Sequence, residues 1–180
     1  ATDDDGEEDD DEDEEEEDDR PRFTLSGVSL PRWKLALDIS SGWPFFVGTY
    51  RISLGIPFNL EVSVEARSMW RYTEIDGRVR WGIRLLRFLA LGAEIGLGGG
   101  FGEYERSSFV FNLTAFQGFE LGRIAIGIRE RLLAYSDNYS EGRPREGGAL
   151  FFLGAALEVQ LSDAFHLFGT VDWAPGQDQR

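Results

Sequence analysis

The sequence lacks cysteine altogether and has one histidine among its 180 residues. Disulfide bonds and thiolate metal sites are therefore excluded, and no part of the fold can depend on the redox state of its surroundings. This composition fits an exported bacterial protein, although many cytosolic proteins lack cysteine as well. Because the chain begins at Ala1 and not at methionine, we expect that a secretory signal peptide has been removed, although an artificial chain end would look the same.

The first 19 residues contain no base. They hold 16 of the 33 acidic residues, whereas the rest of the chain carries 17 acids against 18 Lys and Arg. Such a block repels itself and has nothing to bury, so we expect residues 1–19 to be a disordered acidic tail. The tail is either a solvated segment or a weak, multivalent binder of divalent cations such as Ca²⁺ or of a basic partner. A neutral body with an acidic tail gives no support to nucleic-acid binding.

An amphipathic helical pattern is also missing. From Arg32 onward apolar and polar side chains alternate with a period of two, which is typical of β-strands. Residues 81–97 are apolar enough to suggest a membrane-spanning helix, but Arg84, Arg87 and Glu94 lie within them, and lipid tolerates such charges badly. The alternating segments cover residues 32–40, 48–58, 60–73, 78–87, 89–102, 107–117, 123–135, 149–161 and 164–173.

The connections between these segments alternate between short and long. Short ones fall near residues 57–59, 87–88, 120–122 and 162–164, and longer polar loops separate the other segments. This pattern indicates an antiparallel up-and-down sheet, which hides its edges best by closing into a barrel. The alternation becomes irregular at Glu130, where we expect a β-bulge or the end of the apolar zone.

Two kinds of barrel share this period: a soluble, lipocalin-like barrel with an apolar interior, and a transmembrane barrel with an apolar exterior and a polar lumen. The small size of many polar-face residues favours the second, because a narrow lumen needs small residues beside long charged ones. Segments of about 9–13 residues also suit a tilted strand that crosses a bilayer. The small polar-face residues include Gly55, Gly82, Gly92, Gly96, Gly98, Gly100, Gly127 and Gly154.

Aromatic residues gather on the apolar face, many of them near the ends of segments. Membrane barrels carry aromatic girdles at both interfaces with water, and these residues are placed to form them. The expected interface aromatics are Trp33, Tyr50, Trp70, Tyr72, Trp81, Phe101, Phe109, Phe151, Phe165 and Trp173.

In this pattern, residues 32–173 resemble the small outer-membrane β-barrels of Gram-negative bacteria, the type that includes the OmpA membrane domain, OmpX and OmpW. The resemblance implies an up-and-down transmembrane β-barrel of 8–10 strands, located in the bacterial outer membrane among lipid and lipopolysaccharide. Bacterial single-chain barrels have an even number of strands, whereas nine segments are present here. We favour a tenth strand at residues 23–30 over the two alternatives, a barrel of eight strands or a last strand that is missing after Trp173. Residues 20–31 are then a linker or a short first strand, and residues 174–180 a C-terminal tail.

The polar face collects charged side chains that would line the lumen. Unpaired buried ions cost several kcal/mol each, so we expect a salt-bridge plug that closes the pore. The alternative is a narrow conduit or pocket that prefers anions, because bases outnumber acids nine to six when the histidine is left out. The expected lumen residues are Lys34, Asp38, Arg51, Glu61, Glu65, Arg67, Arg71, Arg78, Arg80, Arg84, Glu94, Arg129, Arg131, Glu158, His166 and Asp172.

Catalytic signals are weak. His166, with Asp172 and Glu158 near it, would suit a lipid-modifying hydrolase only beside a nucleophilic serine, and no serine stands in a recognisable motif. We therefore expect no catalytic residue, no cofactor and no metal site. Arg143 and Arg145 lie in an expected outer loop, where lipopolysaccharide phosphates are plausible ligands and simple solvation is the alternative.

The sequence thus predicts an integral outer-membrane barrel with a structural, binding or assembly-subunit role, possible partners being other envelope proteins. A narrow anion channel, a lipid-modifying membrane enzyme and a soluble ligand-binding barrel are the alternatives, in that order.

Overall fold

A computed structural model describes residues 25, 27–42, 47–69, 72–102, 107–138 and 146–175. This part of the chain forms one antiparallel sheet of nine β-strands, whose order in space is their order in the sequence. The predicted all-β, up-and-down architecture is confirmed. The strands are β1 (Leu35–Gly42), β2 (Val47–Ile56), β3 (Leu60–Met69), β4 (Tyr72–Leu86), β5 (Leu89–Gly102), β6 (Ser107–Leu121), β7 (Ile124–Asn138), β8 (Glu146–Ser162) and β9 (Phe165–Trp173).

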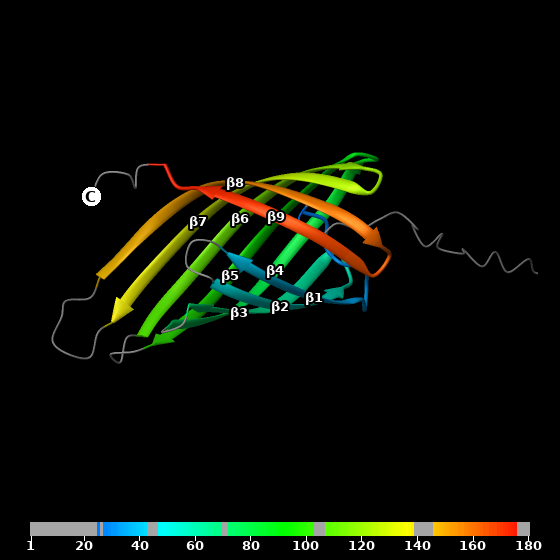
Figure 1. Cartoon of the computed structure of the whole chain (residues 1–180). Helices are drawn as coiled ribbons and strands as arrows, with labels where there is room; N and C mark the ends of the chain where they lie inside the picture. Colours follow the sequence, from blue (N-terminus) through cyan, green and yellow to red (C-terminus); the bar gives the residue numbers. More distant parts are fainter. Residues whose placement is uncertain are drawn as a thin grey trace, which may run out of the picture.

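The sheet curls strongly into a half-barrel (Figure 1). β1 and β9 are its two edges, and over the described residues they do not pair with each other. The predicted closure into a barrel is therefore not found. Side chains on the outer, convex face are more exposed in the two edge strands than in the centre of the sheet. Leu37 of β1 is 61 % exposed and Val171 of β9 is 74 % exposed, whereas Leu113 of the central strand β6 is 45 % exposed.

The tenth strand predicted at residues 23–30 is also wrong over its described part. Residues 25 and 27–30 have turn and irregular backbone, and residues 23, 24 and 26 lie outside the described residues. Gly27 has a φ of 97°, a conformation that a strand does not allow, and Pro31 has no N–H to offer to a ladder. The segment instead enters the concave side of the sheet.

Several strands extend beyond the segments predicted from the alternation. β4 begins at Tyr72 and not at residue 78, and β6 ends at Leu121 and not at residue 117. Polar residues at these strand ends resemble loop sequence, but they keep the period of two and continue one face of the sheet. Residues 81–97, the rejected helix candidate, form the end of β4 and the start of β5. No helix in the described part of the chain has the length and hydropathy to cross a membrane.

The ladder is regular at Glu130, where either a bulge or the end of the apolar zone was expected, so the bulge is not found. Glu130 pairs with Ala115 of β6 and Leu153 of β8 without a register shift. Its exposed side chain therefore lies on the convex face. Register shifts occur instead between Arg84 and Leu86 and between Gln160 and Ser162, next to two of the short turns.

The short turns, at residues 57–59, 87–88, 122–123 and 163–164, all join strands at one end of the sheet, named here the short-turn end. Two of them use left-handed backbone: φ is 68° at Phe58 and 56° at Asn59, and Gly122 has a φ of 62°. Positive φ at both central residues matches the right-handed twist of the paired strands, which explains the tight β2–β3 hairpin.

The two faces of the sheet differ sharply in chemistry. Large apolar side chains on the convex face are exposed, for example Ile52 at 55 % and Leu97 at 52 %. The largest fully buried side chains among the described residues are instead polar and lie on the concave face. They are Arg80, Glu158, Asn112, Asp76 and Ser53. A water-soluble domain places its apolar side chains inside, so this sheet has the opposite arrangement.

Candidate functional site

A network of ion pairs fills the concave face, and Glu94 of β5 is at its centre. Arg78 and Arg80 of β4 each donate to its carboxylate at 3.0 Å, and Arg51 of β2 reaches the same carboxylate. Glu94 and Arg80 are directly paired in the β4–β5 ladder, and each is 2 % exposed. The strand register thus places one acid where three guanidinium groups converge.

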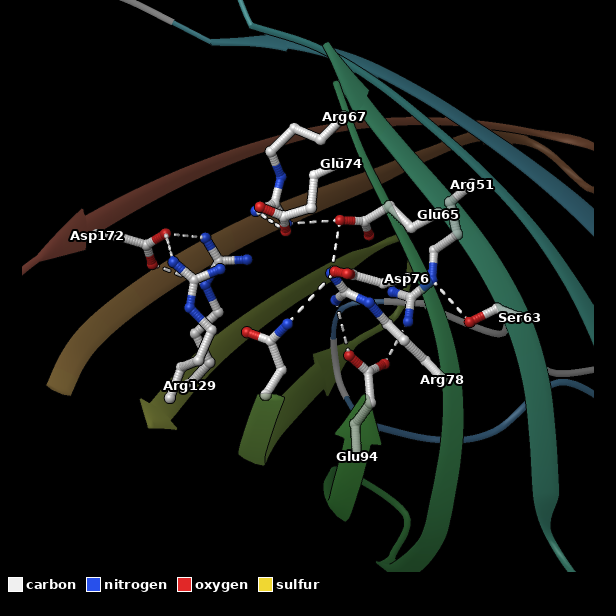
Figure 2. A network of polar contacts seen from close by, with 12 residues as sticks. Arg51, Ser63, Glu65, Arg67, Glu74, Asp76, Arg78, Glu94, Arg129 and Asp172 are labelled. Carbon is white, nitrogen blue, oxygen red and sulfur yellow. Dashed lines mark hydrogen bonds and ion pairs between the residues drawn. The ribbon is translucent and has the colours of Figure 1, made fainter. Parts of the chain in front are cut away.

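Arg78 connects this centre to a second group of acids. Besides Glu94, Arg78 donates to Glu65 of β3 at 2.6 Å and to Asp76 of its own strand at 3.0 Å. Arg67 of β3 then donates to Glu65 at 2.7 Å and to Glu74 of β4 at 3.1 Å. Figure 2 shows these side chains pointing toward one another from β2, β3, β4 and β5. The result is one continuous chain of charges across four strands.

Further ion pairs continue the network toward β9. Arg129 of β7 forms a bidentate pair with Asp172 of β9, at 2.8 and 2.5 Å. Arg131 lies 3.9 Å from the same carboxylate, with its guanidinium 4.5 Å from the centre of the Phe152 ring. Nearer the short-turn end, Arg84 of β4 donates to Glu120 of β6 at 2.8 and 2.5 Å.

The N-terminal segment crosses the concave face at the short-turn end. We name residues 25 and 27–31 the strap; it is drawn in dark blue in Figure 1. At one end the Leu25 amide donates to Glu158 of β8 at 2.8 Å, and at the other end the Leu30 amide donates to Glu61 of β3 at 3.1 Å. Between them the Ser29 hydroxyl donates to the Gly82 carbonyl of β4 at 3.3 Å. The strap therefore reaches from β8 to β3.

Glu158 holds more than the strap. Its side chain is fully buried, and its second carboxylate oxygen lies 2.8 Å from His166 Nδ1 of β9. The single histidine, considered above as part of a hydrolase, thus contacts the carboxylate that binds the Leu25 amide. This contact gives His166 a structural role in orienting Glu158.

The small residues of the concave face serve two purposes. The expected one is room for polar side chains: at four glycines an added Cβ atom would meet the charged Arg78, Asp76 or Arg129–Asp172 pair, or the uncharged Tyr72. These are Gly96, Gly98, Gly100 and Gly154. The other purpose was not foreseen, because at four more glycines the added Cβ would meet backbone atoms of the strap. These are Gly55, Gly82, Gly92 and Gly127.

Most side chains expected in the lumen take part in the contacts described above. Asp38 is half-buried beside Arg51 in the β1–β2 ladder, and Lys34 is exposed just before β1. Arg71, Arg143 and Arg145 lie outside the described residues. The expected residues in ion pairs or hydrogen bonds are Arg51, Glu61, Glu65, Arg67, Arg78, Arg80, Arg84, Glu94, Arg129, Arg131, Glu158, His166 and Asp172.

Four acids on the concave face were missed. Glu74, Asp76, Glu120 and Asp137 are all buried, and each stands in a stretch that was assigned to a connection. Continuing the period of two into these stretches would have found them. With these four, the described residues of the site carry ten acids against eight bases, since Arg71 is not described. The predicted excess of bases, which suggested a preference for anions, is thus reversed over the described residues.

The aromatic residues mostly lie where they were expected, on the convex face. Seven of them, at convex-facing strand positions, are between 45 % and 69 % exposed: Tyr50, Trp81, Phe101, Phe109, Phe151, Phe165 and Trp173. Trp33 is 63 % exposed in the turn before β1. Trp70 lies outside the described residues. Tyr72 differs, because β4 starts there and its hydroxyl contacts the Ser108 hydroxyl on the concave face. The expectation treated residues 60–73 as one strand, so the hairpin reversed the face of Tyr72.

Fold and site together define an all-β protein of the up-and-down type, curled around an ionic interior. Comparisons with family models, curated proteins and solved structures found no match to this chain. The resemblance to small outer-membrane barrels therefore stays a prediction.

Proposed function

We propose that this protein is an integral protein of the bacterial outer membrane, with a structural, binding or assembly-subunit role and a plugged lumen. The observation that carries the proposal is the inversion of the two faces: the convex face is apolar and exposed, and the concave face buries charge. Membrane barrels have this arrangement, because lipid surrounds the outside and water or polar side chains fill the inside.

The spacing of the aromatic residues supports the proposal. On β6, Phe109 and Phe119 are exposed near opposite ends of the strand. Ten residues of strand extend about 34 Å, which becomes about 25 Å along the axis of a barrel whose strands tilt by roughly 40°. This height matches the apolar band of outer-membrane barrels.

The open edges favour a role as a subunit. Unpaired N–H and C=O groups of β1 and β9 would be costly in hydrocarbon, which offers no hydrogen-bond partner. A half-barrel that spans a membrane therefore needs pairing at both edges. Other envelope proteins are the proposed partners, with lipid and lipopolysaccharide covering the convex face and divalent cations bound weakly at the acidic tail.

A plug agrees with the geometry better than an anion conduit does. The ion pairs around Glu94 join β2, β4 and β5, and the strap crosses the short-turn end. The acids of the described site also outnumber its bases, so no excess of positive charge attracts anions. A catalytic role has no support beyond His166, whose partner Glu158 holds the strap.

Migration on SDS gels tests the proposal. We expect protein folded in detergent or lipid vesicles to migrate at a different position before and after boiling, and to float with vesicles in a density gradient. A truncated protein that lacks only the acidic tail, residues 1–19, should behave in the same way. We expect this because the convex face, and not the tail, provides the affinity for the membrane. Monodisperse, folded protein in buffer without detergent would contradict the proposal.

A further inference from the structure

The strap lies in a groove whose features fit a polypeptide backbone. The Gly27 carbonyl lies over Gly82 and Gly92, which face each other in the β4–β5 ladder, and a Cβ atom on either would overlap this oxygen. At Gly127 an added Cβ would lie 2.7 Å from the Leu25 carbonyl oxygen, and at Gly55 it would overlap the Pro31 carbonyl. Four strands thus leave space at the places where the strap backbone passes.

The groove also provides specific hydrogen bonds at both ends. Glu61 is 3 % exposed and Glu158 is fully buried, and each accepts a backbone amide of the strap. Buried carboxylates form strong hydrogen bonds with amide donors because little water competes for them. The strap in turn requires a glycine at position 27. Gly27 has a left-handed φ, and a Cβ atom there would lie 2.7 Å from Phe116 Cβ.

We propose that this groove is a peptide-binding site, and that it holds the strap as a stopper across the short-turn end of the lumen. The ligand class is a short peptide segment that contains a glycine in the left-handed conformation, and the occupant is the strap of the same chain, residues 25 and 27–31. The site includes Glu61, Gly82, Gly92, Phe116, Gly127 and Glu158. The binding does not depend on the membrane, whereas the role as a stopper rests on the proposed function.

Thiol labelling tests the binding. Because the chain has no cysteine, Ser29→Cys places a single thiol in the strap, where Ser29 is 5 % exposed, and Ser162→Cys gives an exposed reference. We expect a water-soluble maleimide to modify Cys at position 29 at least about tenfold more slowly than at position 162, since the strap must open first. Equal rates would overturn the site.

Two glycine substitutions provide the matched comparison. Gly82→Ala is expected to raise the labelling rate at position 29 by about tenfold or more, because its Cβ overlaps the strap. Gly77→Ala in the same strand is the control, since its Cβ would meet nothing closer than the Leu97 carbonyl at 3.9 Å on the convex face. If Gly82→Ala does not fold, Gly27→Ala changes the strap and leaves the sheet intact. Equal labelling in Gly82→Ala (or Gly27→Ala) and Gly77→Ala would overturn the proposal.

Planar-bilayer recordings on the same full-length variants test the stopper. We expect ion current through Gly27→Ala to exceed that through Gly77→Ala, because only the first loosens the strap. Faster labelling of position 29 without any rise in current would overturn the stopper and leave the proposed function intact. Failure of every variant to insert, with the labelling contrast preserved, would instead contradict the proposed function and support the peptide-binding site alone.

Discussion

At the scale of single residues, the site depends on how acids and bases are distributed over neighbouring strands. Glu94 forms ion pairs with Arg51, Arg78 and Arg80 at once. Arg78 in turn is shared among Glu65, Asp76 and Glu94. Loss of one acid therefore leaves several buried guanidinium groups with less compensation.

Glu94→Gln is expected to lower the free energy of unfolding by about 3–5 kcal/mol, the usual effect of breaking a buried ion pair on one side. The amide keeps the shape of the side chain and removes only its charge. Urea titration in detergent measures the change. Asp163→Asn, in the exposed β8–β9 turn, is the control and should stay within about 0.5 kcal/mol. A similar, small effect for both variants would show that the network contributes little to stability.

Glu130 gives a second prediction at this scale. It is the one charged side chain at a convex-facing position of the described strands, between Ala115 and Leu153. If the convex face contacts lipid, Glu130→Leu should raise the free energy of unfolding in bilayers by about 1–2 kcal/mol, somewhat less than the effect of a basic residue at that depth. Arg123→Leu, in the exposed β6–β7 turn, should have no such effect. Unchanged stability of Glu130→Leu would indicate that water surrounds this face.

Much of the site can be predicted from the sequence, because alternation assigns each charged residue to a face. Arg78, Arg80 and Glu94 are found in this way. Their mutual contacts are not, because these depend on strand register. Glu74 and Asp76 were missed for a different reason: polar residues next to a glycine resemble a turn, although the strand continues there in ladders with both β3 and β5.

At the scale of elements, the strands and the strap differ in how their backbone groups are satisfied. The central strands have a neighbour on both sides, whereas β1 and β9 have a neighbour on one side only over the described residues. The strap has no ladder, and its amides donate to the carboxylates of Glu61 and Glu158. Alternation could not predict the strap, because its path is set by Gly27 and by glycines on four distant strands.

Hydrogen exchange measures this difference between elements. We expect every second amide of β1 and β9, on the side without a neighbour, to exchange at least about 100-fold faster than the amides of β5 and β6. The Leu25 and Leu30 amides should be protected to an intermediate degree, since each has a buried acceptor. Uniform protection across β1, β5 and β9 would mean that both edges are already paired in the sample.

At the scale of the whole molecule, the two faces of the sheet differ in chemistry, and the proposed membrane location rests on this contrast. The fold class was predictable, since the period of two extends over the whole body of the chain. The proposed membrane location needs a test that separates lipid from water, because both kinds of barrel share that period.

The cost of a charge on the convex face should depend on depth if that face contacts lipid. Ile95→Arg, in the middle of β5, is expected to lower the free energy of unfolding by about 2–4 kcal/mol in bilayers, and Leu121→Arg, at the short-turn end of β6, by about 0–1 kcal/mol. Both side chains are exposed, at 46 % and 62 %, so neither change disturbs a packed interior. Chemical denaturation in vesicles measures both values, and equal values would contradict a lipid-facing belt.

The described residues form nine strands, and this odd number has a directional consequence. Successive strands of an up-and-down sheet reverse direction, so β1 and β9 point the same way. Closing this sheet into a barrel with antiparallel pairing throughout therefore requires an odd number of additional strands, and the smallest such number is one. A second copy of the nine-stranded unit, inserted with the same orientation, would instead pair β9 of each copy with β1 of the other, and both of these pairs would be parallel.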